Sequence, residues 1–125
     1  MKKLIIALVL GACGSVAMAT TTDVCTPGSP PFNVVGAVDG SKFIGVTFAP
    51  TCSTNTVMVG DDDGTKYWGT AASVKGQSIF GASTNGGSAG NMGPCNSGKA
   101  CGTAAATKTA ISGKMTDAAA LGNTN

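Results

Sequence analysis

The sequence contains no histidine, no glutamate and no arginine. Without histidine, neither a Ser-His-Asp nor a Cys-His arrangement for nucleophilic catalysis is available, and a Cys-x-x-Cys-His haem motif is absent. A pair of aspartates can act as acid and base, but the only clustered ones are Asp61, Asp62 and Asp63, which precede Gly64 in a pattern typical of a solvated turn. These absences predict a protein that is not an enzyme.

Charge is also scarce, since charged side chains make up 11% of the 125 residues. Once residues 1–19 are set aside, six lysines and six aspartates remain, and the net charge is close to zero. Nucleic acid needs a concentrated basic surface, and an anionic membrane surface attracts a polybasic patch. Neither is therefore an expected partner. The surface must consist largely of Thr, Ser, Asn, Gly and Ala, as in an extracellular scaffold.

The N-terminus has the pattern of a secretory signal peptide. Met-Lys-Lys precedes the apolar run 4–10, which is short for a transmembrane helix, and an Ala-Met-Ala cleavage pattern ends at Ala19. We predict a signal peptide over residues 1–19, export to the periplasm, and a single domain over residues 20–125. In a second interpretation the Leu-Gly-Ala-Cys run that ends at Cys13 is a lipoprotein signal, and Cys13 is lipidated.

Four cysteines remain after such processing, namely Cys25, Cys52, Cys95 and Cys101. An even number in a small exported chain indicates two disulfides, for which three pairings are possible. We favour Cys25–Cys52, which would bracket the segment between them, and Cys95–Cys101, which would close a short loop. A zinc site is not expected, because the chain has no Cys-x2-Cys pair.

The segment 32–50 predicts a β-hairpin. Two runs rich in β-branched and aromatic residues flank Asp39-Gly40, a dipeptide suited to a two-residue type I′ turn. This turn would place Val35 opposite Ile44. Both faces of the hairpin would be apolar, unlike those of a sheet with one wet face. One face would carry Phe32, Val34, Val38 and Phe43, and the other Val35, Ile44, Val46 and Phe48.

Two further strands, over residues 55–60 and 65–70, complete a mainly β fold with a four-stranded antiparallel meander sheet. Beyond them the chain is expected to form a long, disulfide-closed C-terminal loop region, because residues 83–102 are rich in glycine, asparagine and serine. Residues 103–115 are read as a further edge strand, and residues 116–122 as one or two helical turns.

No stretch after Ala19 combines ten or more residues with large apolar side chains at helical spacing. The predicted sheet therefore has at most one good internal cover. Either irregular segments wrap both faces, or a helix from another chain covers one of them. The expected partner-binding residues are Val35, Ile44, Val46 and Phe48. If the opposite face docks instead, they are Val34, Val38 and Phe43.

The acidic turn and the neighbouring aromatic pair each allow a second interpretation. No cofactor is expected, but an oxygen-rich turn can bind calcium, which makes Asp61 and Asp63 weak calcium candidates. The match to an EF-hand fails, because the closing glutamate is absent. Tyr67 and Trp68 could stack on a sugar. We favour packing for this pair, since the chain has one Trp and one Tyr.

The predicted sheet followed by a disulfide-closed loop resembles the globular head of type IV pilins and of type II secretion pseudopilins. Here the long N-terminal pilin helix is missing. The runs Asp-Asp-Asp-Gly-Thr-Lys-Tyr-Trp-Gly-Thr-Ala (61–71) and Cys-Asn-Ser-Gly-Lys-Ala-Cys (95–101) are similar to the separate C-terminal chain of a split type IV pilin, of the geopilin domain 2 type. The resemblance covers the whole mature chain.

The resemblance implies a non-enzymatic structural subunit. Its partner would be a short N-terminal helical pilin chain, with which it would form a heterodimer that makes homotypic contacts in a filament. The chain would not insert into a membrane by itself, and the filament would stand on the cell surface or span the periplasm. The alternative is a free or lipid-anchored secreted module that binds a glycan or a protein.

Overall fold

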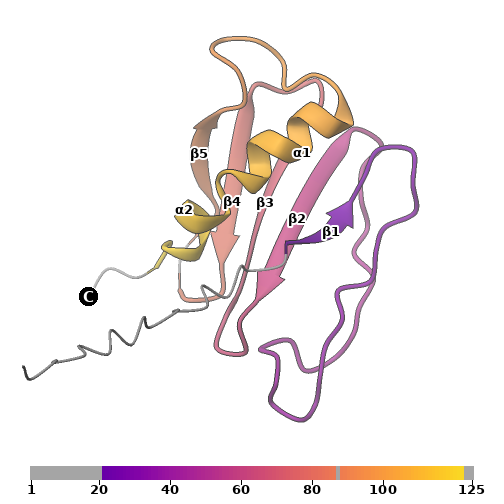
Figure 1. Cartoon of the computed structure of the whole chain (residues 1–125), viewed down its shortest axis with the longest axis vertical. Coiled ribbons are helices and arrows are strands. Elements are labelled where there is room, and N and C mark those ends of the chain that lie inside the picture. The colour runs from indigo at the N-terminus through magenta and orange to yellow at the C-terminus, as the bar shows by residue number, and fades with distance from the viewer. Residues whose placement is uncertain (1–20, 87, 123–125) are drawn as a thin grey trace, which may run out of the picture.

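The computed structural model describes residues 21–86 and 88–122 and is mainly β (Figure 1). Five antiparallel strands form one sheet in the order β1-β2-β3-β4-β5. The predicted signal peptide and Cys13 lie outside the described residues. In the described part, no helix is long and apolar enough to cross a membrane. The elements are β1 (Thr22–Cys25), β2 (Thr56–Asp62), β3 (Tyr67–Ser73), β4 (Ser78–Ser83), β5 (Gly90–Pro94), α1 (Ala104–Ser112) and α2 (Met115–Ala119).

The core lies between the sheet and the two helices, which both cross the same face (Figure 1). Alternate residues of each strand point to this face. Trp68 is 7% exposed there, as the packing interpretation expected. Thr70 is also buried, and its hydroxyl donates to the Ile111 carbonyl at 2.9 Å, which fastens β3 to the end of α1. The other core side chains are Val57, Val59, Ala72, Ile79, Cys101, Ile111, Met115 and Ala118.

The strands predicted over residues 55–60 and 65–70 correspond to β2 and β3. The predicted count of four strands is wrong. The other three strands are β1, β4 and β5, rather than the two arms of the hairpin. β5 lies inside the segment that composition assigned to a loop, where Ile79 pairs with Gly93. Backbone pairing needs no large side chain, so a glycine-rich strand carries little pattern in its sequence.

Helix α1 occupies the segment that was predicted as an edge strand. The side chain of Thr103 accepts a hydrogen bond from the Ala106 amide at 3.2 Å and caps the first turn. Three alanines follow, and alanine is the best helix former. The buried positions Thr107, Ile111 and Met115 recur every four residues from α1 into α2. The strand prediction was wrong because this stripe contains a threonine and few large side chains.

The predicted hairpin over 32–50 is not part of the sheet. It lies in the long loop, defined here as residues 26–55 between β1 and β2. Val34 and Phe48 exchange two backbone hydrogen bonds, at 2.9 and 3.1 Å, and form an isolated bridge. This register differs from the predicted one. The chain crosses itself closely at Gly36, where an added Cβ would lie 2.5 Å from the Val46 backbone. The two arms therefore do not form a regular ladder.

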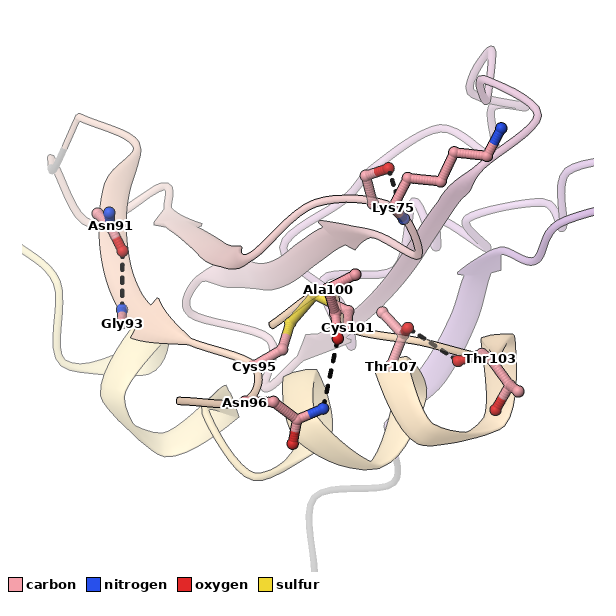
Figure 2. The surroundings of a disulfide bond; sticks show 10 residues. Lys75, Asn91, Gly93, Cys95, Asn96, Ala100, Cys101, Thr103 and Thr107 are labelled. Atoms are coloured by element: carbon pink, nitrogen blue, oxygen red, sulfur yellow. Dashed lines mark hydrogen bonds between the residues drawn. A yellow bond between two sulfur atoms is a disulfide. The ribbon is translucent and has the colours of Figure 1, made fainter. Parts of the chain in front are cut away.

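Two disulfides join Cys25 to Cys52 and Cys95 to Cys101, which is the pairing favoured from the sequence. The first closes the long loop at its base, and the second closes a loop between β5 and α1 (Figure 2). On the loop-closure model these bonds stabilise the fold by about 3.5 and about 2.4 kcal/mol. Two disulfides in so small a domain indicate an oxidising environment, extracellular or periplasmic.

Candidate partner-binding surface

The second face of the sheet, opposite the helices, is only partly covered. On β4, Ile79 is 1% exposed and points to the helices, so its neighbour Phe80 points the other way and is 52% exposed. Ala82 lies on the same side as Phe80 and is exposed. Across the strands, Phe80 pairs with Ala71, which pairs with Met58. These residues therefore form one row on the second face.

The long loop covers the other end of this face. Val34 and Ile44 of the loop pack with Val24 of β1 in a small second cluster. Met58 and Tyr67 contact the edge of this cluster and are partly buried. The part of the second face beyond the loop is called the open sheet face below, and it consists of Met58, Tyr67, Ala71, Phe80 and Ala82.

Two glycines leave room for side chains to lie flat on the open sheet face. Gly60 and Gly69 lie directly opposite each other on β2 and β3. A Cβ on Gly60 would overlap the Tyr67 hydroxyl, and a Cβ on Gly69 would lie 3.3 Å from the Met58 methyl group. The Tyr67 and Met58 side chains thus lie flat over the two glycines. Beside them is a shallow hollow of about 190 Å³, whose lining includes Gly69 and Ala82.

The partner-binding residues predicted from the sequence separate in the structure. Val46 is 74% exposed, and Val35 and Phe48 are also exposed. Ile44 is half-buried in the second cluster and is the least accessible of the four. In the opposite set, Val38 and Phe43 are exposed, whereas Val34 is 6% exposed and packs inward. Both sets contribute surface, because the segment is an irregular loop and not a flat hairpin.

Phe80 is the residue that the sequence reasoning missed. Six of the seven large exposed apolar side chains of the described residues belong to the long loop, and Phe80 is the seventh. Only Phe80 projects from a regular strand, where the backbone holds its position. The signal was present in the sequence, because alternation on a strand that buries Ile79 places Phe80 on the other face.

The acidic turn after β2 holds the long loop. The Asp62 carboxylate accepts hydrogen bonds from the amides of Phe43 at 2.7 Å, Ile44 at 3.0 Å and Gly64 at 2.9 Å. The first two amides belong to the loop, so Asp62 ties its tip to the β2–β3 turn. Sequence reasoning gave Asp62 no role of its own.

The weak calcium candidates each bond within the same turn. Asp61 accepts from the Asp62 amide at 2.8 Å, and Asp63 accepts from the amides of Thr65 and Lys66, both at 2.9 Å. Across residues 21–86 and 88–122, no group of three or more Asp or Cys side chains is placed to hold a metal ion. The geometry of this turn thus assigns its carboxylates to backbone amides.

The titration of these aspartates follows from their contacts. Partial burial alone raises the pKa of Asp62, but hydrogen bonds from the Ile44, Phe43 and Gly64 amides and the nearby charge of Lys42 outweigh it, so the pKa lies below its ordinary value of 3.8. The hydroxyl and amide of Thr65 similarly lower the pKa of Asp63. Both side chains are therefore charged at neutral pH.

The aromatic pair does not form an exposed platform. Trp68 is buried, and the Lys66 ammonium lies 5.4 Å from the centre of its ring. The hydroxyl of Tyr67 is buried, and no hydrogen-bond partner is described for it. Burial, followed by the negative charges of Asp62 and Asp61, raises the pKa of Tyr67. Trp68 is thus closed to a sugar, and Tyr67 is only partly exposed.

Together these features define a small disulfide-bonded β domain with one sheet face packed under helices and the other partly open. No protein-family model, curated protein or solved structure matches the chain. Among the described residues, Phe80 is the one large exposed apolar side chain that projects from a regular strand, and it belongs to the open sheet face.

Proposed function

We propose that this chain is a non-enzymatic structural subunit of a type IV pilus or secretion pseudopilus, and that it docks on an apolar helix of a separate short pilin chain. The observation that carries the proposal is the open sheet face. A regular β-sheet with apolar side chains on both sides needs a cover on both. The two helices of this chain cover one side, and the long loop covers only part of the other.

The shape of the open sheet face favours a helix as its cover. Ala71 and Ala82 are small, and the hollow beside Met58 lets an opposing backbone come close. Phe80 stands at the side of this low area and can fit between the side chains of an amphipathic helix, as in helix-in-groove recognition. Phe80 is 52% exposed, so burial of its exposed half contributes about 1–1.5 kcal/mol, before the cost of association is subtracted.

The exposed residues of the long loop provide a second apolar area. Val35, Val46 and Phe48 belong to a segment held by the Cys25–Cys52 disulfide and by Asp62. We assign this area to contact between neighbouring subunits. In a filament the apolar helices would lie inside and the Thr-, Ser- and Asn-rich surface of this domain would lie outside. Export precedes both steps in this proposal.

The proposal is tested by co-expression of this chain with a short pilin chain that consists mainly of the N-terminal helix. We expect the two chains to copurify, and we expect the chain alone to bind a dye for exposed apolar surface. Phe80→Asp should abolish copurification, because docking would bury an unpaired carboxylate. Phe48→Asp is the matched control, since Phe48 is 46% exposed on the other apolar area.

Each outcome of this experiment has a separate meaning. If only Phe48→Asp abolishes copurification, the proposal of a helical partner is kept, and the docking surface is the long loop. If the wild-type chain stays a well-dispersed monomer without dye binding and never copurifies, the structural-subunit proposal is wrong. The alternative of a free secreted binding module would then take its place.

A further inference from the structure

The charges outside the two ion pairs of the domain are divided unevenly between its two ends. Of the six lysines and six aspartates in residues 20–125, Lys108 pairs with Asp23 at 2.7 Å and Lys114 with Asp117 at 3.1 Å. The remaining charges fall into two groups. The acidic end has Asp39, Asp61, Asp62 and Asp63 together with Lys42 and Lys66, and the basic end has Lys75 and Lys99.

The acidic end consists of the β2–β3 turn and the tip of the long loop. The bonds from Asp62 to the loop amides hold these two segments together. The hydroxyl and amide of Ser41 lower the pKa of Asp39, so this carboxylate is charged as well. Next to it, Val38 is 91% exposed. The acidic end thus combines a net negative charge with a protruding apolar side chain.

The basic end consists of the β3–β4 turn and the Cys95–Cys101 loop. The amide of Cys101 donates to the Gly76 carbonyl at 2.7 Å, and the amide of Cys95 donates to the Gln77 carbonyl at 2.9 Å. These bonds hold the disulfide loop, which carries Lys99, against the turn, which carries Lys75. Both lysines are exposed, and Figure 2 shows the Lys75 side chain pointing away from the disulfide.

The two ends are too far apart to neutralise each other. β3 runs from one end to the other with seven residues, which span about 20 Å at the usual rise of a strand. The Debye length is about 8 Å at physiological salt. In Figure 1, whose vertical is the longest axis, the β2–β3 turn lies at the bottom and the disulfide loop at the top.

We propose that the acidic end of one copy binds the basic end of a second copy, so that subunits join head to tail. The two surfaces are different and lie at opposite ends of the domain, so the contact is heterologous. Such a contact forms an open filament unless the rotation between neighbouring copies closes a ring. This inference rests on the proposed function and adds to it the contact between neighbouring subunits. The open sheet face is not used, so a helical partner binds at the same time.

The expected contact is weak and depends on salt. Exposed ion pairs contribute little individually and are screened by salt. In a filament, the helical partner would hold neighbouring domains close together and raise their effective concentration. Charge complementarity then selects the register and direction of stacking more than it supplies affinity.

The test uses sedimentation velocity of the exported chain at about 0.01 M and about 1 M salt. Two charge-reversed variants are needed. Lys75→Glu with Lys99→Glu makes both ends acidic, and Asp61→Lys with Asp63→Lys makes both ends basic while Asp62 is kept. We expect the wild type to associate at low salt only, and each variant alone to associate about tenfold more weakly.

The decisive sample is an equimolar mixture of the two variants, in which association should return. The matched control is Lys108→Glu with Lys114→Glu, which changes the charge by the same amount away from both ends and should associate better than the Lys75 and Lys99 variant. The inference is wrong if association is equal at low and high salt, or if the mixture of the two variants does not associate. Copurification with the short pilin chain should be unchanged in every variant, so a failure of the end-to-end contact is separable from a failure of the proposed function.

Discussion

Asp62→Ala should loosen the long loop while the sheet stays folded. The substitution removes a carboxylate that accepts three backbone hydrogen bonds, at 2.7, 3.0 and 2.9 Å. Asp62 is partly exposed, so water replaces part of each bond, and a net value of about 0.5–1 kcal/mol per bond is appropriate. The sum is about 2 kcal/mol, which lowers the melting temperature of a domain of this size by about 10 °C.

The assay combines thermal unfolding with amide hydrogen exchange. We expect the amides of Phe43 and Ile44 to exchange faster in the variant, because the carboxylate is their acceptor, while amides in β3 keep their protection. Asp61→Ala is the control. It removes the same charge from the same turn, but Asp61 accepts only the Asp62 amide, so the melting temperature should change little.

The effect of Asp62→Ala should also depend on pH. The pKa of Asp62 is lowered in the folded state, so its contribution is fully present above the ordinary value near 3.8 and is lost as the pH falls through the lowered folded value. The wild type and the variant should therefore converge in stability at acid pH. If Asp62→Ala and Asp61→Ala melt alike at neutral pH, Asp62 does not hold the loop.

Two further predictions concern the two faces of the sheet. Thr70→Val should lower the free energy of unfolding by about 1 kcal/mol, because it removes the buried hydroxyl that bonds the Ile111 carbonyl; an unchanged denaturant midpoint would contradict this. Gly60→Ala should cost about 1–3 kcal/mol, since its Cβ would displace the Tyr67 ring, whereas Gly45→Ala should be close to neutral because a Cβ there meets no atom within 4 Å. Equal melting temperatures for the two glycine variants would refute the packing of Tyr67 over Gly60.

The sheet centre and the disulfides were predictable from the sequence because they depend on local patterns. β2 and β3 have alternating side chains on either side of an Asp-Gly turn, and such a pattern predicts paired strands. The even number of cysteines indicated two bonds, and the favoured pairing joins Cys95 to Cys101 across a separation of six residues. The packing of Trp68 followed from the scarcity of aromatic residues.

The long loop was mispredicted because its conformation is decided by a distant residue. The apolar alternation around Asp39-Gly40 favours a hairpin, and Gly40 does adopt a positive φ of 78°. However, Asp62 accepts hydrogen bonds from the amides of Phe43 and Ile44, so these amides do not donate to a regular β-ladder. An acceptor 18 and 19 residues away along the chain leaves no trace in local patterning.

The candidate surface was predicted only in its general character. The sequence predicted that one sheet face would lack an internal cover, and the second face is indeed partly open at Phe80. The contacts predicted in segment 32–50 lie on the long loop, because that segment is not part of the sheet. Helix α1 was missed for a separate reason. The buried stripe of Thr107, Ile111 and Met115 contains only two large apolar side chains, so a search for large apolar side chains at helical spacing does not detect it.

The Cys25–Cys52 bond has a consequence for the resistance of the domain to proteases in an oxidising extracellular or periplasmic environment. It makes residues 25–52 a covalently closed ring, and the exposed tip at Val38 and Gly40 is the kind of site that extracellular proteases cut. A single cut in this ring divides the polypeptide, yet the two pieces remain joined through sulfur. A domain nicked at this exposed tip thus remains one molecule.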